Sequence, residues 1–184
     1  MNMGKHHLNC ISAANSADGI VLGTAVSLDA KIVNNISADN GGNAVRILGG
    51  QVFSSAFNNI LYRNGGRGVY YWYFGDYNCS YANGVQDYLP DLGPHAIAVD
   101  PLVDATKNCR FTSQSSPCVN AGHPASFYND PDGSRCDMGA RGGPEARNWW
   151  RDPFTGPVVV NVTIDPPQVR PGSNIVIRAT ARAE

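Results

Sequence analysis

The sequence is poor in charged residues. Only 16% of its 184 residues are Asp, Glu, Lys or Arg, and the formal net charge is −1. This near-neutral balance gives no reason to expect a nucleic acid or an anionic membrane surface as a partner. The chain also lacks any apolar run near the roughly 20 residues that a membrane-spanning helix needs, so we predict no insertion into a membrane.

Several motifs of known chemistry are missing as well. The five cysteines form no C-x-x-C pair, which argues against a zinc site. No phosphate-binding loop is present, and no Ser-His-Asp or Cys-His arrangement can be assembled from the sequence. Three cysteines fall in the C-terminal half: Cys109, Cys118 and Cys136. They predict either one disulfide in a secreted protein or a set of buried free thiols.

The N-terminus lacks the apolar core of a signal peptide and starts abruptly inside what looks like a repeat. We therefore expect a piece of a longer protein whose targeting signal lies upstream. What the chain does have is 42% hydrophobic residues, 20 Gly and 12 Pro. This composition is typical of a globular domain made of short strands and many tight turns.

A repeat of about 24 residues runs through the first half of the chain. The segments NCISAANSADGIVL, NNISADNGGNAVRI and NNILYRNGGRGVYY align, and YNCSYANG matches their first half. Two aligned columns define the register: Ile11, Ile36, Ile60 and Cys79, and Asn15, Asn40, Asn64 and Asn83. The runs are short, β-rich and punctuated by Gly and Asn, which excludes helical repeats, and no fixed Leu supports a leucine-rich repeat.

The repeat therefore predicts a parallel β-helix of three to four coils, in which aligned side chains stack at roughly 4.8 Å. Asn tolerates the left-handed backbone of corners, and its amide can bond to the Asn one coil away. We expect the aligned Asn residues to form such ladders. The same role is expected for Asn35 and Asn78, which makes glycosylation of their Asn-x-Ser triplets unexpected. Asp39 and Arg63, also aligned, predict a surface ion pair between coils.

After Gly84 the period breaks and a set of turn motifs follows. They are Gly93-Pro94-His95, Asp100-Pro101-Leu102, Ser116-Pro117-Cys118, Ala121-Gly122, Asp130-Pro131-Asp132-Gly133, Asp137-Met138-Gly139-Ala140 and Gly142-Gly143-Pro144. Together with the repeats, over about residues 8–145, this order resembles the C-terminal end of the bacterial right-handed parallel β-helix repeat proteins, which include choice-of-anchor Q domain and pectate-lyase-like solenoids. This chain departs from that family at Asn120 and His123, where the family tends to have Asp, and near Arg141, where it tends to have an aromatic residue.

The resemblance implies an all-β fold, a right-handed parallel β-helix with a turn-rich C-terminal cap, in a secreted or cell-surface protein. It implies no single activity. The tail differs, because residues 158–184 alternate apolar and polar side chains around a Pro-Gly turn and look like the start of a truncated Ig-like module. We therefore predict a β-helix and cap over 1–145, a linker over 146–157 and a partial Ig-like β segment over 158–184. The open edge of the first coil and this tail are the places where we expect self-association.

One face of the predicted solenoid carries aromatic and basic residues. If the aligned Ile20, Val45 and Val69 point inward, the alternation of a strand turns their neighbours outward. Tyr70 and Trp72 would then lie beside Arg46 and Arg67. Aromatic faces offer flat apolar area to sugar rings and Arg donates to hydroxyls or carboxylates, so these four residues predict a carbohydrate-binding platform. The alternative is that the aromatic residues pack beneath the segment 85–94.

An acidic turn offers a candidate metal site. Asp130 and Asp132 stand at alternate positions before Gly133, with Asp137 nearby, and oxygen ligands in this spacing suit Ca²⁺. The alternative is a Pro-Asp-Gly turn in which the Asp side chains accept hydrogen bonds from backbone amides. Apart from this Ca²⁺ site, we expect no cofactor.

Three functions remain open from the sequence. The first is a non-catalytic surface β-helix that binds a polysaccharide or serves as a stalk. The second is the C-terminal fragment of a polysaccharide lyase or a glycoside hydrolase, which would need clustered carboxylates. The aligned residues Asp18, Asn43 and Arg67 supply only one acid, so we identify no catalytic residue. The third is a purely structural adhesion or assembly module.

Overall fold

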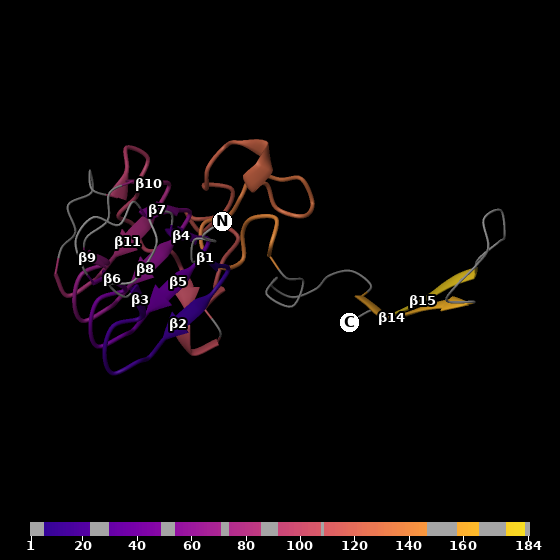
Figure 1. The fold of residues 1–184 in the computed structure, drawn as a ribbon, viewed down its shortest axis with the longest axis horizontal. Coiled ribbons are helices and arrows are strands. Elements are labelled where there is room, and N and C mark those ends of the chain that lie inside the picture. The colour runs from indigo at the N-terminus through magenta and orange to yellow at the C-terminus, as the bar shows by residue number, and fades with distance from the viewer. Residues whose placement is uncertain are drawn as a thin grey trace. The chain divides into compact units, whose positions relative to one another are not determined.

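The computed structural model describes residues 6–22, 30–48, 54–70, 74–85, 92–107, 109–146, 158–165 and 176–182. The chain divides into two compact units, Met1–Trp150 and Arg151–Glu184. The described residues of the first unit are organised by three parallel sheets (Figure 1).

Sheets I and II take one strand from each of the four repeats, and sheet III takes one from each of the first three. Sheet I contains β1 (His6–Leu8), β4 (Ala30–Val33), β7 (Ser54–Phe57) and β10 (Phe74–Asp76). Sheet II contains β2 (Ile11–Ala13), β5 (Ile36–Ala38), β8 (Ile60–Tyr62) and β11 (Cys79–Tyr81). Sheet III contains β3 (Ile20–Leu22), β6 (Val45–Ile47) and β9 (Val69–Tyr70). Every strand of these three sheets pairs in parallel with its equivalent one repeat along the chain. We call the strands of one repeat a coil.

The described part of the chain contains no α-helix, so its fold is all-β, and the stacked parallel sheets are compatible with the predicted parallel β-helix. The predicted register is confirmed. Ile36 pairs with Ile11 on one side and Ile60 on the other, and Cys79 pairs with Ile60. In sheet III, Val45 pairs with Val69.

The predicted asparagine ladder is also confirmed. The side-chain amide of Asn15 donates to Oδ1 of Asn40 at 2.8 Å, Asn40 donates to Asn64 at 2.9 Å, and Asn64 donates to Asn83 at 2.9 Å. Each of these Oδ1 atoms also accepts the backbone N–H of the Asn below it. The ladder thus provides hydrogen-bond partners for the polar groups that the coils bury.

A second ladder runs between sheets I and II. The amide of Asn35 donates to Asn59 at 3.1 Å, and that of Asn59 donates to Asn78 at 3.0 Å. Asn35, Asn59 and Asn78 are fully buried. The side chains of Asn35 and Asn78 are therefore closed to glycosylation in the folded chain, as the sequence predicts.

The corners themselves differ from expectation in one detail. Within the coils, the residues with positive φ form two columns: Asn9, Asn34, Asn58 and Tyr77, and Ala14, Asp39, Arg63 and Ala82. The second column lies one residue before the ladder of Asn15 and its equivalents. The ladder residues therefore do not make the left-handed turn but follow it, where their amides point along the stack.

Two hydrophobic clusters fill the first unit. One lies inside the stack and joins the three sheets, with Ile20, Leu22, Ile32, Val45, Ile47 and Leu61 among its buried members. The other covers the opposite face of sheet II and contains Ile36, Ile60, Tyr62, Cys79, Cys118 and Met138. The outer face of sheet II is thus buried, because it is covered by residues that come much later in the chain.

The predicted cap is placed differently from a simple lid. Only its first part lies over the last coil, where the amide of Asn78 donates to the Leu92 carbonyl at 3.0 Å and Ile97 forms a bridge with Cys79. Beyond it come the short antiparallel pair β12 (Val103–Asp104) and β13 (Arg110–Phe111), with the 3₁₀ turn η2 (Ala105–Lys107) between them, and then η3 (Ser126–Tyr128).

The last part of the cap runs back along the side of the stack. Three Asn residues of the first positive-φ column hold it. The carbonyl of Asn58 accepts from the N–H of Gly139, the side-chain amide of Asn34 donates to the Gly139 carbonyl at 3.2 Å, and that of Asn9 donates to the Gly142 carbonyl at 2.7 Å. The physical reason is the apolar outer face of sheet II, which needs a cover along its length.

The second unit contains two described strands, β14 (Val158–Asp165) and β15 (Val176–Arg182). They pair antiparallel, with a register shift between Val159 and Asn161. This agrees with the alternating pattern of the tail, and the assignment to an Ig-like module stays a prediction. Within the described residues, no helix is long and apolar enough to span a membrane.

Candidate functional site

The outer face of sheet III brings Val21 into one row with two residues of the predicted platform, Arg46 and Tyr70. Val21 pairs with Arg46, and Arg46 pairs with Tyr70. All three point outward: Val21 is 46% exposed and Tyr70 is 40% exposed, and Arg46 is also exposed. Their inward neighbours Ile20 and Val45 are buried. The alternation inferred from the sequence is therefore confirmed for Arg46 and Tyr70.

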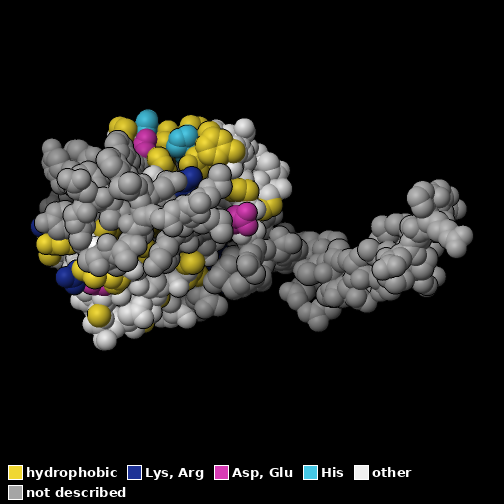
Figure 2. Space-filling view, viewed as in Figure 1, with side chains coloured by type: hydrophobic (Ala, Val, Ile, Leu, Met, Phe, Trp, Pro, Cys, Tyr) yellow, Lys and Arg dark blue, Asp and Glu magenta, His cyan; other side chains and the backbone are white. Residues whose placement is uncertain are grey.

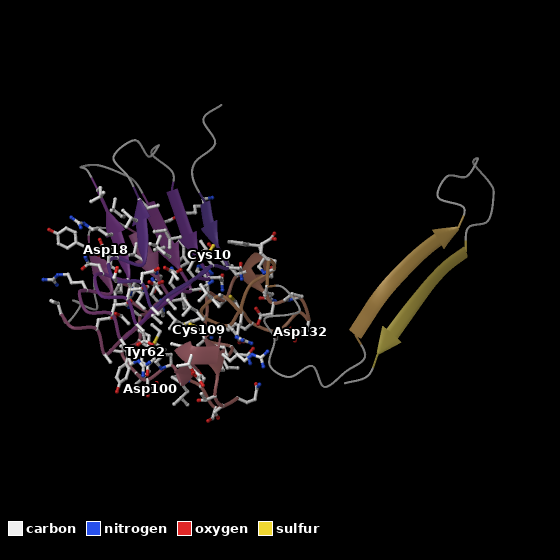
Figure 3. All side chains as sticks on the ribbon, turned by 90° about the horizontal axis from the view of Figure 1, so that it is seen from below. Cys10, Asp18, Tyr62, Asp100, Cys109 and Asp132 are labelled. Atoms are coloured by element: carbon white, nitrogen blue, oxygen red, sulfur yellow. The ribbon has the colours of Figure 1, made fainter. Side chains whose placement is uncertain are left out.

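Arg46 is held in place on this face by Asp18 of the preceding coil, at 3.1 Å between Nη1 and Oδ2. Burial alone would raise the pKa of Asp18. Hydrogen bonds from the backbone and side chain of Asn43 and from Arg46 outweigh burial and hold this pKa below its ordinary value. Asp18 is therefore ionised at neutral pH and orients the guanidinium group beside Tyr70. In Figure 3, Asp18 lies on the side of the fold away from Asp132 of the cap.

The other two residues of the predicted platform are Arg67 and Trp72. Arg67 is exposed and forms a bridge with Val85, and its backbone N–H donates to Oδ1 of Asn43 at 3.0 Å. Val85 is 42% exposed. Trp72 lies outside the described residues, as do residues 86–91 of the segment 85–94 that the sequence offered as a cover.

A second exposed surface lies where β10, β11 and the cap meet, and we call it the aromatic–histidine cluster. Its members are Phe57, Tyr77, His95, His123, Phe127 and Tyr128. The rings of Tyr77 and His95 stack at 4.6 Å, and that of His123 meets Tyr77 at 5.0 Å. Phe127 is 69% exposed. Figure 2 shows histidine side chains among hydrophobic ones at the upper edge of the molecule.

Asp76 fixes the imidazole of His95 in this cluster. One carboxylate oxygen lies 2.7 Å from Nδ1 of His95, and the other accepts the backbone N–H groups of His95 and Tyr77. Burial would raise the pKa of Asp76, but these hydrogen bonds outweigh it and lower the pKa. An ionised Asp76 only accepts hydrogen bonds, so Nδ1 of His95 donates to it and Nε2 is the ring nitrogen that takes no part in this contact.

Little in the sequence indicates this cluster. Its residues come from separate parts of the chain. Only Phe57 and Tyr77 occupy aligned positions of the coils, and Tyr77 stands where the earlier coils have Asn. Both histidines follow Gly within one or two residues, in GPH and GHP. That pattern signals a turn but not the contact between the two turns.

The predicted calcium residues are arranged as caps of backbone amides. Asp130 accepts from Gly143 and Asp137, Asp132 accepts from Ser134 at 3.0 Å, and Asp137 accepts from Asn120 at 2.7 Å. Among the described residues, no group of three or more His, Cys, Asp or Glu side chains is arranged to hold a metal ion. The hydrogen bonds agree with the alternative given from the sequence, and calcium binding stays a prediction without geometric support.

Asp130 nevertheless has a perturbed carboxyl group. It is 8% exposed. Burial, together with the nearby charges of Asp137 and Asp132, raises its pKa to about 6 in spite of the two amides that it accepts.

The cysteines carry no disulfide in the structure. Cys10 is exposed, and Cys79, Cys109, Cys118 and Cys136 are buried free thiols. Burial raises the pKa of Cys109 to about 11 and that of Cys136 to about 12. These thiols are protonated at neutral pH, which makes them poor nucleophiles.

Comparison with known proteins adds no family assignment. Scans of protein-family models, of curated protein sequences and of solved structures each found no match to this chain.

Proposed function

We propose that this chain is a right-handed parallel β-helix module of a secreted or cell-surface protein, and that it binds a polysaccharide on the outer face of sheet III. The observation that carries the proposal is the row of Arg46 and Tyr70. They are register partners on adjacent parallel strands, both exposed, with the guanidinium fixed by Asp18. The likeness of the repeats and turn motifs to β-helix repeat proteins supports the cellular setting.

The chemistry of this row suits a sugar chain. An exposed Tyr ring offers a flat apolar surface to the C–H face of a pyranose and a hydroxyl for its edge. Arg46 lies one strand away, about 4.8 Å along the stack, and offers planar donors to sugar hydroxyls or to the carboxylate of a uronic acid. Since Asp18 already orients Arg46, little side-chain entropy is lost on binding.

A periodic face also fits a periodic ligand. Val21, Arg46 and Tyr70 lie one coil apart from each other. Arg67 and Val85, which form a bridge just before the strands of sheet III, are also exposed. A linear polysaccharide can make similar contacts with successive coils, and weak contacts at each coil then add up.

The test is a glycan array on the whole chain, followed by titration of the best ligand against Tyr70→Ala. We expect the variant to bind at least about tenfold more weakly, a loss of roughly 1.4 kcal/mol. The matched control is Tyr81→Ala, because Tyr81 is 37% exposed, close to the 40% of Tyr70, but lies in sheet II and stacks on Tyr62 at 6.2 Å. Equal affinity of the Tyr70 variant and the unchanged protein would overturn the proposal, as would an array without any bound glycan.

One observation favours a catalytic alternative, the C-terminal part of a polysaccharide lyase or glycoside hydrolase. The pair Asp76 and His95 presents an oriented imidazole whose Nε2 can accept a proton, and its side chain is 58% exposed. Incubation of the chain with the glycan that binds, followed by assay of new chain ends, tests this. Activity that His95→Gln abolishes while Phe127→Ala retains it would support the catalytic alternative, and intact glycan would exclude it for this chain.

A further inference from the structure

Two of the buried thiols lie against each other across the junction between the last coil and the cap. Cys79 begins β11, and Cys118 lies in the cap. Each is 0% exposed, and both belong to the cluster that covers the outer face of sheet II. The thiol of Cys118 is hydrogen-bonded to that of Cys79, and the Cys79 thiol donates to the Val99 carbonyl at 3.4 Å.

The position of Cys79 is unusual within its own column. Earlier coils place Ile11, Ile36 and Ile60 there, and Cys79 is the register partner of Ile60. A smaller side chain at this point leaves room for Cys118 to approach from the cap.

The backbone on the cap side is fixed as well. The N–H of Cys118 donates to Oγ of Ser116 at 3.1 Å, and its carbonyl accepts from Met138 at 2.9 Å. Ser116 Oγ in turn donates to the Pro101 carbonyl at 2.6 Å. These hydrogen bonds fix the backbone of Cys118, and packing within the same buried cluster places its thiol beside that of Cys79.

We propose that Cys79 and Cys118 form a disulfide when the chain folds in the presence of a small-molecule disulfide, and that this bond fastens the cap to the last coil. In the first step, the thiolate of one cysteine attacks a sulfur of oxidised glutathione and releases one glutathione thiolate. In the second step, the other cysteine attacks the mixed disulfide and releases the second. The protein loses two hydrogen atoms, and oxidised glutathione is reduced to two thiols.

Cys136 and Cys10 are not poised for this reaction. Cys136 accepts the side-chain amides of Asn34 and Asn58 at 3.2 and 3.4 Å and donates to the Asp137 carbonyl at 3.0 Å. Cys10 lies exposed on the first coil. The pairing is therefore expected to be selective for Cys79 and Cys118.

The timing follows from the protection of the thiols. The hydrogen bond to Cys79 and burial raise the pKa of Cys118 far above its ordinary value. Exchange needs a thiolate and access to solvent, so the folded, reduced chain reacts slowly. The bond is expected to form during folding, before the cluster closes.

The test is refolding of the whole reduced chain with a mixture of oxidised and reduced glutathione, followed by tryptic digestion without reduction. Cleavage after Lys and Arg places the five cysteines in five different peptides, which are 6–31, 68–107, 108–110, 111–135 and 136–141. We expect one cross-linked species that joins 68–107 to 111–135 and is lighter than the sum of the two by two hydrogen atoms. Free thiols at both positions, or a cross-link between other peptides, would overturn the proposal.

A second readout uses stability. Closing a loop between these residues constrains the unfolded chain, so we expect the oxidised form to melt about 10 °C above the form kept in reductant. Cys109→Ala removes another thiol of the same cluster and is expected to keep both the cross-link and the difference in Tm. Cys118→Ala is expected to lose both. A cross-link at Cys79 that survives in Cys118→Ala, or an unchanged Tm difference in it, would count against the proposed pair.

Discussion

The side-chain amide of Asn40 donates to Oδ1 of Asn64 at 2.9 Å, while its own Oδ1 accepts both the backbone N–H and the amide of Asn15. Asn40 is buried and Asn15 is exposed. A single side chain therefore connects three coils, and its polar atoms have no access to water. The stack depends on this ladder because removal of one member leaves the groups of its neighbours unpaired in the interior.

Replacement of Asn40 by Ala is expected to lower the free energy of unfolding by about 3 kcal/mol, since it orphans groups on Asn15 and Asn64 and leaves a small cavity. Denaturant unfolding followed by far-UV circular dichroism measures the change. Asn15→Ala is the matched control at the exposed end of the same ladder, with an expected loss of about 1 kcal/mol or less. Equal losses for the two variants would show that burial of the ladder does not determine its contribution.

Close backbone stacking predicts a second difference between matched variants. A methyl group added at Gly65 would collide with the carbonyl oxygen of Gly41 one coil below, whereas at Gly133 nothing lies within 4 Å. Gly133 has a φ of +86°, so Gly133→Ala is expected to cost roughly 1–2 kcal/mol from backbone strain alone. Gly65→Ala is expected to cost more, about 3 kcal/mol, because the backbone of two coils must separate. Thermal unfolding of both variants tests this order, and a more stable Gly65 variant would contradict the close stacking.

The sequence alone predicted the parts of the fold that repeat. The columns of Ile36 and Asn40 could be read directly because each coil presents the same side chain to its neighbour, so periodicity in the chain becomes contact in space. The outward position of Arg46 and Tyr70 followed from simple alternation along the strand.

The contacts of the cap could not be predicted in this way. Asn9 bonds to Gly142 across 133 residues, and His123 bonds to Asn58 across 65 residues. No period relates these positions, and the corner Asn residues carry no mark that separates a corner that holds the cap from any other. The aromatic–histidine cluster and the Cys79–Cys118 contact were missed for the same reason, since both arise only where the returning cap meets the coils.

The carboxyl group of Asp130 predicts a defined pH dependence. Its pKa is about 6 in the folded chain against 3.8 for an unperturbed Asp carboxyl group, so between these two pH values the folded state binds more protons than the unfolded state. The contribution of Asp130 to stability is therefore largest below pH 4, and it falls as the pH rises through 6, by on the order of 2 kcal/mol. NMR titration is the direct measurement, with a midpoint near 6 expected for the Asp130 carboxyl and for the Gly143 amide that it accepts. A midpoint below 5 would contradict the effect of burial.

A last prediction concerns the charge of the proposed glycan-binding face. Arg46→Gln removes the ion-pair partner of Asp18 and leaves a negative carboxylate near Tyr70. Binding of an acidic polysaccharide is therefore expected to weaken about two- to fivefold, as for an exposed ion pair worth up to roughly 1 kcal/mol. The variant is also expected to show a smaller loss of affinity with added salt, because one screened attraction is gone. Arg63→Gln is the matched control, since the Arg63 side chain is 47% exposed against 45% for Arg46 and is likewise paired with a carboxylate of the coil below, that of Asp39. Titrations at two salt concentrations distinguish the cases. If both variants bind equally well, Arg46 does not contact the ligand, and recognition on this face rests on Tyr70 alone.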